Sequence, residues 1–434
     1  MPEDNAREAS PKSSGNLGVL APSDTVRRGT SDRPGQPDRP LLTLIRNAEV
    51  FDPSALGRRD VLVCAGTVVA IAPSIEAPRQ IACEVVDVEG RALIPGLVDA
   101  HVHLGGGGGE SGFASRVPAL TLTQTTSAGV TSVVGLLGTD TTTRTMEDLV
   151  ARTYALREEG LSAWCWTGGY AVPPRTLTGS VRSDIVFVDP IVGVGETAIS
   201  DHRSSQPTFE ELIKLAADCH VAGLTSGKAG VLHLHLGDGA RGLSMVDRAL
   251  RETELPARVF HPTHVNRQPV LFDQAMELAR ATGLTVDVTA FPVDGEDPAI
   301  TAEDAIEKWL DAGIQRACLT VSSDGGGCLP VFDADGRLIE MDVGKSSMLI
   351  ATLRLLIAEQ RALADVLPFF TSHPATQLRL ARKGRVVVGG DADLVVLDHG
   401  IVVRDVMARG RWMVRDRAST VRGTFEREGG ARPC

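Results

Sequence analysis

Short apolar runs alternate with amphipathic stretches through the middle of the chain, from about residue 96 to residue 380. Eight apolar runs end in polar residues, at 97–104, 131–140, 163–170, 191–203, 231–238, 258–266, 285–291 and 317–327. Between them, apolar residues recur at helical spacing at 146–160, 208–223, 244–253, 271–283 and 300–313. This alternation predicts an α/β fold with a parallel sheet, and eight strands favour a (β/α)8 TIM-like barrel over an open sheet.

The two ends of the chain have a different pattern. Short β-rich runs, among them LLTLIRNAEVFD and IVVRDVMARGRWMVRD, are separated by Gly and Pro. We therefore predict a barrel over residues 96–380 and one small β-sandwich domain formed from both chain ends, at 41–95 and 381–425. Residues 1–40 show no apolar period and are predicted to be a disordered tail, and residues 426–434 a C-terminal tail.

Composition narrows the class of protein. The 434 residues are 43% hydrophobic and 23% charged, which is typical of a globular protein. The net charge of −11 argues against nucleic acid or an anionic membrane as a partner, and no apolar run reaches the length of a membrane span. The N-terminus has no signal-peptide pattern, and the seven scattered cysteines contain no CxxC. We expect a cytoplasmic protein with reduced thiols.

Histidines and carboxylates lie at the ends of the predicted strands. His101 and His103 form an H-x-H pair, and the two-residue period of a strand puts both imidazoles on one face. Four further strands end in a metal-binding type of residue: Glu196, His235, His264 and Asp324. The carboxyl ends of barrel strands meet at one face, so we expect these six side chains at one mouth. Such ligands predict two divalent metal ions with a bridging hydroxide as nucleophile, and zinc is the metal we expect.

Other residues of the same types have plainer interpretations. We expect His233 to point to the opposite face of its sheet and pack beneath a helix, and His261 to be a core histidine. The five glycines at 105–109 are not followed by Lys-Ser or Lys-Thr, so they predict a flexible substrate loop and not a phosphate-binding loop.

Several stretches resemble a known family. PGLVDAHVHL near the start of the predicted barrel and ADLVVLD near the chain's end are similar to segments of the amidohydrolase superfamily. The combination of GGGGES, AISDHRS and PTHVNR resembles, within that superfamily, the isoaspartyl (β-aspartyl) dipeptidases. The resemblance covers about residues 41–425 and implies a metal-dependent hydrolase, a small dipeptide as substrate and a homo-oligomer.

The resemblance also implies roles for individual residues. His101 and His103 would bind the more buried metal, and His235 and His264 the more exposed one. Asp324 would be a metal ligand and the general base that returns its proton to the leaving amine.

The same resemblance implies a set of substrate-binding residues. Glu110 would pair with the substrate ammonium, and Arg203 and Arg267 would hold its carboxylates. Tyr170 would polarise the scissile carbonyl together with a metal, and Thr139 would line the pocket.

Two positions depart from the family pattern. Glu196 stands where many relatives have a carboxylated lysine that bridges the metals. Glu is the shorter side chain, so the backbone must come closer to the metals, which Gly195 could permit. Cys328 stands where the pattern has a serine that binds the substrate carboxylate, and a thiol is a weaker hydrogen-bond donor.

The sequence therefore predicts hydrolysis of β-aspartyl dipeptides by a metal-bridging hydroxide. One alternative is a cyclic-amide or N-acyl-amino-acid amidohydrolase, against which Glu110, Arg203 and Arg267 weigh, because a cyclic amide has no ammonium. A second alternative is a non-catalytic oligomeric scaffold on the same fold, against which the full set of candidate ligands weighs.

Overall fold

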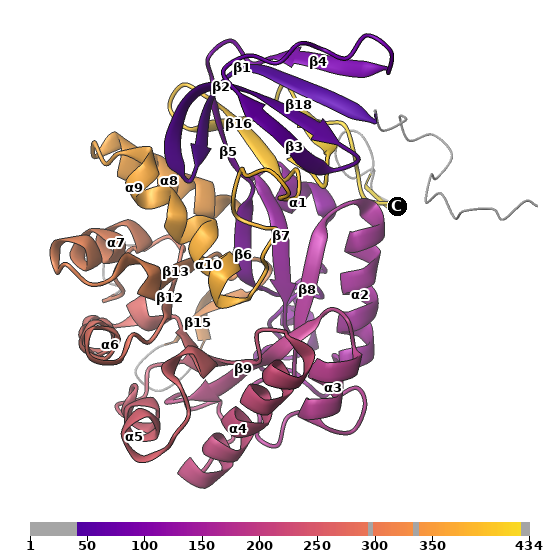
Figure 1. Ribbon diagram of the computed structural model, residues 1–434. Helices are drawn as coiled ribbons and strands as arrows, with labels where there is room; N and C mark the ends of the chain where they lie inside the picture. Colours follow the sequence, from indigo (N-terminus) through magenta and orange to yellow (C-terminus); the bar gives the residue numbers. More distant parts are fainter. Residues whose placement is uncertain (1–40, 294–297, 333–337, 427–434) are drawn as a thin grey trace, which may run out of the picture. The chain divides into compact units, whose positions relative to one another are not determined.

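The computed structural model describes residues 41–293, 298–332 and 338–426. The predicted N-terminal tail and residues 427–434 of the predicted C-terminal tail lie outside these ranges. Two regions of the chain form separate sheets (Figure 1). Strands of the two chain ends form one, and the strands of the middle, which alternate with helices, form the others.

Strands from both chain ends pair in one nine-stranded sheet. They are β1 (Leu42–Asp52), β2 (Ser54–Cys64), β3 (Thr67–Ala72), β4 (Cys83–Asp87), β5 (Ala92–Pro95), β16 (Leu394–Asp398), β17 (Val402–Ala408), β18 (Arg411–Arg415) and β19 (Ala418–Ser419). The order is β19-β18-β17-β16-β5-β1-β2-β3, and β4 also pairs with β1. The antiparallel pair β5–β16 joins the two ends of the chain.

The middle of the chain forms the predicted parallel strands, each followed by a helix or turn. They are β6 (Leu97–Val102), β7 (Val130–Gly135), β8 (Ser162–Thr167), β9 (Ile191–Ile199), β10 (Val231–Leu236), β11 (Phe260–Thr263), β12 (Val286–Thr289) and β13 (Leu319–Ser322). Strands β6 to β11 form one curled parallel sheet, and β12 pairs with β13 in a second. All eight predicted strands are present.

The longer helices follow the strands as predicted. The α-helices are α1 (Leu122–Thr126), α2 (Met146–Glu159), α3 (Val181–Phe187), α4 (Phe209–Ser226), α5 (Ser244–Glu252), α6 (Pro269–Thr282), α7 (Ala302–Asp311), α8 (Ser347–Ala358), α9 (Leu363–Val366) and α10 (Ser372–Gln377). The sequence pattern did not predict α8, whose sequence SMLIATLRLLIA is apolar on most sides. It also lacked the hairpin of β14 (Cys328–Phe332) and β15 (Leu338–Val343).

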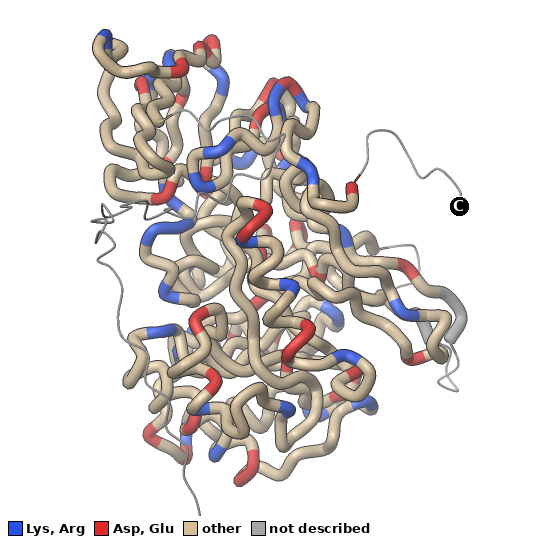
Figure 2. The backbone as a smooth tube through the Cα atoms, turned by 90° about the vertical axis from the view of Figure 1, so that its right-hand side faces the viewer, with Lys and Arg blue, Asp and Glu red and all other residues tan. Residues whose placement is uncertain are grey.

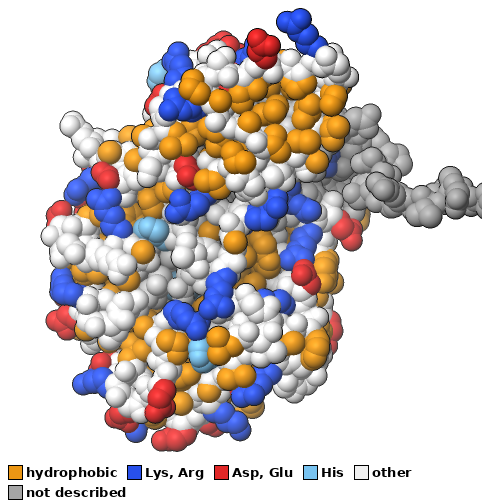
Figure 3. All heavy atoms as spheres, in the orientation of Figure 1, with side chains coloured by type: hydrophobic (Ala, Val, Ile, Leu, Met, Phe, Trp, Pro, Cys, Tyr) orange, Lys and Arg blue, Asp and Glu red, His pale blue; other side chains and the backbone are white. Residues whose placement is uncertain are grey.

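Alternating side chains divide the core of the nine-stranded sheet into two faces. On β16, Leu394 and Val396 belong to a separate core formed by side chains of this sheet. Val395 and Leu397 belong to the larger core that surrounds the parallel strands. This is the two-residue period of a strand that is buried on both faces. The sheet is thereby fixed to the parallel strands by apolar packing. Hydrophobic side chains also gather on the surface over this sheet (Figure 3).

The first and last parallel strands are joined by hydrogen bonds. Val102 forms a parallel bridge with Gly325, and the His103 amide donates to the Gly325 carbonyl at 2.8 Å. Ser323 donates its hydroxyl and its amide to the carboxylate of Asp99. These contacts bring the ends of β6 and β13 together.

Basic and acidic residues are interspersed over the backbone (Figure 2).

Candidate metal centre

The six predicted metal ligands converge at the carboxyl ends of five parallel strands. His101 lies on β6 and His103 just after it, Glu196 lies on β9 and His235 on β10. His264 and Asp324 follow β11 and β13. Each of the six residues is at most 6% exposed. The cluster is therefore closed to bulk water on most sides.

Local backbone conformation aims two of these side chains. His264 and Asp324 have φ angles of 62° and 51°, in the left-handed region that few non-glycine residues adopt. Both residues come directly after a strand, where the chain turns. The Asp324 carboxylate and the His264 imidazole are thereby directed back over the strand ends. A left-handed backbone costs free energy in a non-glycine residue, and such costs are concentrated at functional sites.

The carboxylate of Glu196 lies between the histidines. Its Oε1 is 3.6 Å from His103 Nε2, and its Oε2 is 3.5 Å from His101 Nε2. The same Oε2 is 2.9 Å from His235 Nδ1 and 3.5 Å from His264 Nε2. Asp324 Oδ1 completes the cluster at 3.1 Å from His103 Nε2. One carboxylate is therefore shared by two pairs of imidazoles, as a bridging ligand requires.

The approach of Glu196 depends on a bulge in β9. Gly195 and Glu196 together lie opposite the single residue His233 of β10. A Cβ atom on Gly195 would lie 2.8 Å from the His233 Cβ, so the two strands can pack this closely only with glycine there. Strand β9 continues to Ile199, so Glu196 lies within the strand and does not end it as the sequence pattern predicted.

The donor atoms fit divalent metals. Three overlapping groups have ligand atoms within 4.8 Å of one another: His101, His103 and Glu196; His101, His264 and Asp324; and Glu196, His235 and His264. His101 Nε2 and Asp324 Oδ1 are buried and make no hydrogen bond. Buried polar atoms without partners are rare in proteins, and imidazole nitrogen with carboxylate oxygen is a donor set of zinc and related ions. These atoms therefore have the position and chemistry of ligands.

Burial keeps the imidazoles neutral. It lowers the pKa of His101 and His264 well below the usual value and that of His235 to about 3. Burial and the nearby charge of Asp324 raise the pKa of Glu196 well above its usual value. A neutral imidazole has a free lone pair, and a divalent cation would relieve the repulsion between the two carboxylates. Both features favour metal binding.

Arg203 and Glu110 meet at the rim of the cluster, although Arg203 is already paired. The Arg203 guanidinium donates two hydrogen bonds to Asp201, at 3.1 and 2.8 Å, and its Nη1 lies 3.6 Å from Glu110 Oε1. Thr139 donates to Glu110 at 3.0 Å. The predicted substrate residues Glu110, Thr139 and Arg203 are thus brought together, with the Arg203 fork facing a residue of the chain itself.

Asp201 is a residue of the site that was not predicted from the sequence. Its Oδ2 lies 2.9 Å from His235 Nε2, the nitrogen that faces away from Glu196. Hydrogen bonds from His235 and Arg203 lower the Asp201 pKa against the effect of burial. Asp201 orients a candidate ligand, as carboxylates beside metal-bound histidines do. Its place two residues before Arg203 in AISDHRS was the available signal.

Arg267 and Tyr170 both face the cluster, but their side chains differ in whether they have a hydrogen-bond partner. Arg267 is partly buried, and its guanidinium has no hydrogen-bond or ion-pair partner among the residues that the structure describes. Its charge acts on His264, Glu196 and Tyr170. The Tyr170 hydroxyl lies 2.9 Å from His235 Nδ1, and burial keeps it protonated by raising its pKa. An unpaired guanidinium beside a metal cluster is suited to an anionic ligand group.

Cys328 lies at the start of β14, against the glycine run. A Cβ atom on Gly108 would lie 3.3 Å from the Cys328 Cβ, which places the Cys328 side chain beside the glycine run. Burial raises the pKa of this thiol to about 11. Cys328 is therefore a neutral thiol near neutral pH.

The expectation for His233 was wrong. Its side chain is fully buried, stacks on Trp166 with ring centroids 4.9 Å apart, and lies 2.8 Å from His101. His233 and His235 are two residues apart on one strand, so they share a face, and Leu232 and Leu234 face the outer core instead.

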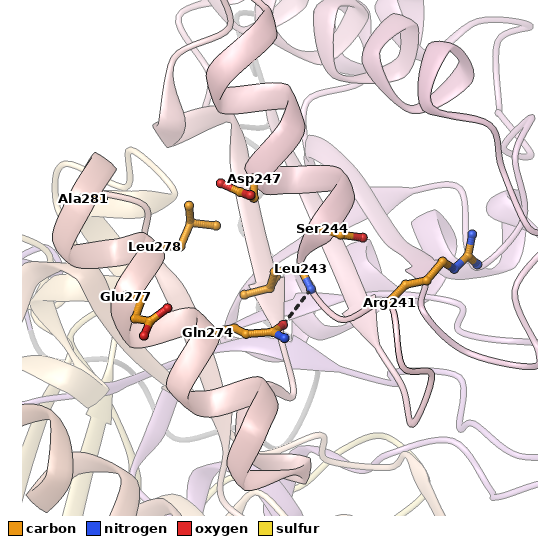
Figure 4. Close-up of a pocket in the computed structure, with 8 residues that line it drawn as sticks. All are labelled: Arg241, Leu243, Ser244, Asp247, Gln274, Glu277, Leu278 and Ala281. Carbon is orange, nitrogen blue, oxygen red and sulfur yellow. Dashed lines mark hydrogen bonds between the residues drawn. The ribbon is translucent and has the colours of Figure 1, made fainter.

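A separate pocket of about 370 Å³ lies between α5 and α6 (Figure 4). It is lined by Arg241, Asp247, Gln274 and Glu277 among others, and contains none of the predicted site residues.

None of the helices in the described ranges combines the length and apolar character that crossing a membrane requires.

Comparison with known proteins identifies relatives over most of the chain. A model of the amidohydrolase family matches residues 92–413. A solved beta-aspartyl dipeptidase from Fervidobacterium islandicum AW-1, in complex with a beta-Asp-Leu dipeptide, is 40% identical with a TM-score of 0.84. The match covers 88% of this chain and 98% of that one.

Two further relatives agree. A second structure of beta-aspartyl dipeptidase from this organism is 39% identical with a TM-score of 0.80, over 87% of this chain and 98% of the other. A dihydroorotase from Solibacter usitatus is 24% identical over 396 residues, which cover 81% of this chain and 87% of that protein. With a family model over most of its length and dipeptidase structures matched almost completely, the chain belongs to the amidohydrolase family and is a hydrolase.

Proposed function

We propose that this protein hydrolyses β-aspartyl (isoaspartyl) dipeptides with two divalent metal ions. The observation that carries the proposal is the cluster of six buried ligands with an acidic residue, Glu110, and an unpaired basic residue, Arg267, at its rim. A β-aspartyl dipeptide has one ammonium and two carboxylates, so it needs groups of both signs. The bound dipeptide in the Fervidobacterium relative supports the same substrate class here.

In this proposal, His101, His103 and Asp324 would hold one ion, His235 and His264 would hold the other, and Glu196 would be a ligand that both share. Zinc is the metal we expect, because its ligands in proteins are imidazole and carboxylate. When bound, two such ions lower the pKa of a water molecule toward about 7 and supply it as the nucleophile.

The chain's own residues bind substrate and move the proton. Asp324 Oδ1 has no hydrogen-bond partner and accepts the proton of the attacking water, which it then delivers to the leaving amine. The protonated Tyr170 hydroxyl donates to the carbonyl oxygen as negative charge develops there. Glu110, positioned by Thr139, pairs with the ammonium, and Arg267 with a carboxylate.

Arg203 contributes through its remaining N–H groups, because Asp201 occupies its fork. Cys328 lies beside the same loop and provides a weak thiol donor to the substrate.

The proposal includes the architecture around the site. We propose that the eight parallel strands close into a (β/α)8 barrel over about residues 96–380. The bridge between Val102 and Gly325 and the bonds from Ser323 to Asp99 support closure between the first and last strands. The nine-stranded sheet, with a core of its own, would then be the β-sandwich domain of residues 41–95 and 381–425.

Two further predictions concern the protein in the cell. A homo-oligomer is supported by the apolar side chains gathered over the nine-stranded sheet, and light scattering of the purified protein measures its mass. We also propose a cytoplasmic location, which agrees with six free cysteines among the residues that the structure describes, and cell fractionation tests it.

Hydrolysis of β-Asp-Leu compared with α-Asp-Leu, with metal content measured on the same sample, tests the proposed function. Cleavage of the β isomer alone by protein with about two metals per chain is the expected result. Two metals without cleavage would reject the dipeptide substrate and move the test to cyclic amides and N-acyl amino acids. Absence of both metal and activity would favour the scaffold instead.

A further inference from the structure

A continuous run of polar side chains leads from the candidate metal centre into the buried interior. His101 Nδ1 lies 2.8 Å from His233 Nε2, and His233 Nδ1 lies 3.0 Å from His261 Nδ1. His261 Nε2 lies 3.0 Å from the Thr320 hydroxyl, which donates to Asp287 Oδ1 at 2.6 Å. All five residues have 0% exposure. A metal-ligand histidine is thereby connected to a carboxylate by side chains that come from five strands.

The carboxylate at the far end fixes the direction of every hydrogen bond. Burial raises the pKa of Asp287 to about 6, and hydrogen bonds from the hydroxyls of Thr320, Thr263 and Ser322 act against that shift. Asp287 is therefore a charged acceptor at neutral pH. Because the single proton of the Thr320 hydroxyl is given to Asp287, His261 Nε2 has to donate to Thr320. A buried imidazole is neutral and carries one proton, so His261 Nδ1 is then an acceptor.

The hydrogen-bond directions continue in the same way to the candidate metal centre. His233 donates from Nδ1 to His261, so its own Nε2 is an acceptor. His101 therefore donates from Nδ1, and its Nε2 has a bare lone pair. That atom is the one that lies 3.5 Å from Glu196 and Asp324 and makes no hydrogen bond. The far carboxylate and the metal position thus require the same proton arrangement in all three imidazoles.

On the basis of the proposed function, we infer that His233, His261 and Thr320 are positioning residues which hold His101 in its metal-binding tautomer. A histidine ligand whose other nitrogen donates to an acceptor is fixed in orientation and is a stronger base toward the metal. In this protein the acceptor of the His101 hydrogen bond is the His233 imidazole. His233 is itself polarised by His261 and, through Thr320, by Asp287. His233 is additionally held by its stack on Trp166 and by the absence of a side chain at Gly195.

The tautomers can be measured directly by NMR on protein labelled with ¹⁵N-histidine. We expect protons on His101 Nδ1, His233 Nδ1 and His261 Nε2, in the metal-loaded and the metal-free protein alike. A proton on His233 Nε2 in the loaded protein would overturn the inference. This measurement does not depend on which substrate the enzyme hydrolyses.

Two variants test the effect on metal binding. His233→Phe keeps a ring on Trp166 and removes the acceptor of His101, so one of the two bound ions should become roughly 10–100-fold weaker in chelator competition. Thr320→Val breaks the link to Asp287 and should weaken the same ion by a smaller factor. Thr153→Val is the matched control, because Thr153 is equally buried but lies on α2, where its hydroxyl donates to the Leu149 carbonyl. It should leave both ions unchanged.

The double variant separates a connected chain from independent packing effects. Once His233 is replaced, Thr320 no longer acts on His101, so His233→Phe with Thr320→Val should bind metal as weakly as His233→Phe alone. Additive losses would contradict the inference, and Thr320→Val with unchanged metal affinity would do the same even if His233→Phe fails to fold. Wild-type protein that binds two ions but cleaves no β-aspartyl peptide would reject the proposed substrate and leave this inference in place.

Discussion

Glu196 reaches the four candidate ligand histidines because the backbone of β9 comes close to them. Its carboxylate oxygens lie within 3.6 Å of nitrogen atoms on four histidines, although Glu is shorter than a carboxylated lysine. The bulge at Gly195 shifts this part of β9 beside His233. The substitution is therefore compatible with a bridging role, because strand geometry makes up for the lost side-chain length.

Asp324→Asn tests the assignment of the general base. The amide keeps an oxygen that can contact a metal but cannot take up a proton. We expect turnover of β-Asp-Leu to fall by roughly 10²–10⁴-fold, with metal content unchanged. Steady-state kinetics and metal analysis on one preparation measure both quantities. Turnover within about tenfold of the wild type would remove Asp324 from the role of general base.

Glu110→Gln tests the recognition of the ammonium. The change removes a charge but keeps the hydrogen bond with Thr139 possible. Because a hydrogen bond to a charged group contributes about 1.5–3 kcal/mol, KM for β-Asp-Leu should rise by roughly 10–100-fold. N-acetyl-β-Asp-Leu, which has no ammonium, is the control substrate and should be processed about equally by both proteins. If KM for the free dipeptide did not change, Glu110 would lie outside the ammonium site.

At the scale of elements, the glycine run 105–109 is a shaped loop and not merely a flexible one. Arg144, which is buried, donates to the carbonyls of Gly107 and Gly108 at 2.7 and 3.1 Å. Val117 donates its amide to the Gly107 carbonyl, and Gly107 donates to Gly326. The loop that presents Glu110 is thus held by hydrogen bonds on several sides.

Gly106→Ala should distort this loop, whereas Gly105→Ala should not. Gly106 has φ of 78°, and a Cβ atom there would lie 1.9 Å from the Val117 carbonyl oxygen. The backbone strain alone is of order 1–3 kcal/mol, so kcat/KM should fall at least about tenfold. At Gly105 the nearest atom would be 3.6 Å away, and kcat/KM should stay within about twofold. Equal kinetics for the two variants would show that the loop shape does not matter for activity.

At the scale of the whole molecule, Lys383 connects the parallel strands to the nine-stranded sheet. Its buried ammonium donates to Ser162 at the start of β8 and to Asp393 just before β16, at 2.6 and 2.5 Å. Asp391 is a further partner at 2.8 Å. The two sheets are therefore joined by buried charges as well as by the apolar face of β16.

Lys383→Met should destabilise the whole protein. Asp393 is 4% exposed and would become a buried charge without its cation, so we expect a loss of about 3–5 kcal/mol in the free energy of unfolding. Arg382→Met is the matched control, because the exposed Arg382 pairs with Asp391 at the surface and should cost at most about 1 kcal/mol. Denaturant unfolding followed by circular dichroism measures both. Equal losses in the two variants would contradict the connecting role of Lys383.

The elements of the fold were largely accessible from local patterns. Alternation of apolar runs with helical stretches gave all eight parallel strands, since each strand is buried and each helix has one apolar face. The pattern did not predict α8, whose apolar residues surround the helix. Boundaries were less accurate, as for Glu196 within β9.

The sequence by itself determined the types and order of the candidate ligands, because H-x-H and strand-end carboxylates are local features. Only the tertiary structure decided that Glu196 faces all four histidines and that Asp201 occupies the fork of Arg203. It also decided that His233 and His261 connect His101 to Asp287. Apart from the contact between Asp201 and Arg203, which are two residues apart, these contacts join residues 28 to 132 positions apart. Side-chain direction across a curled sheet depends on bulges and strand neighbours that no local pattern records.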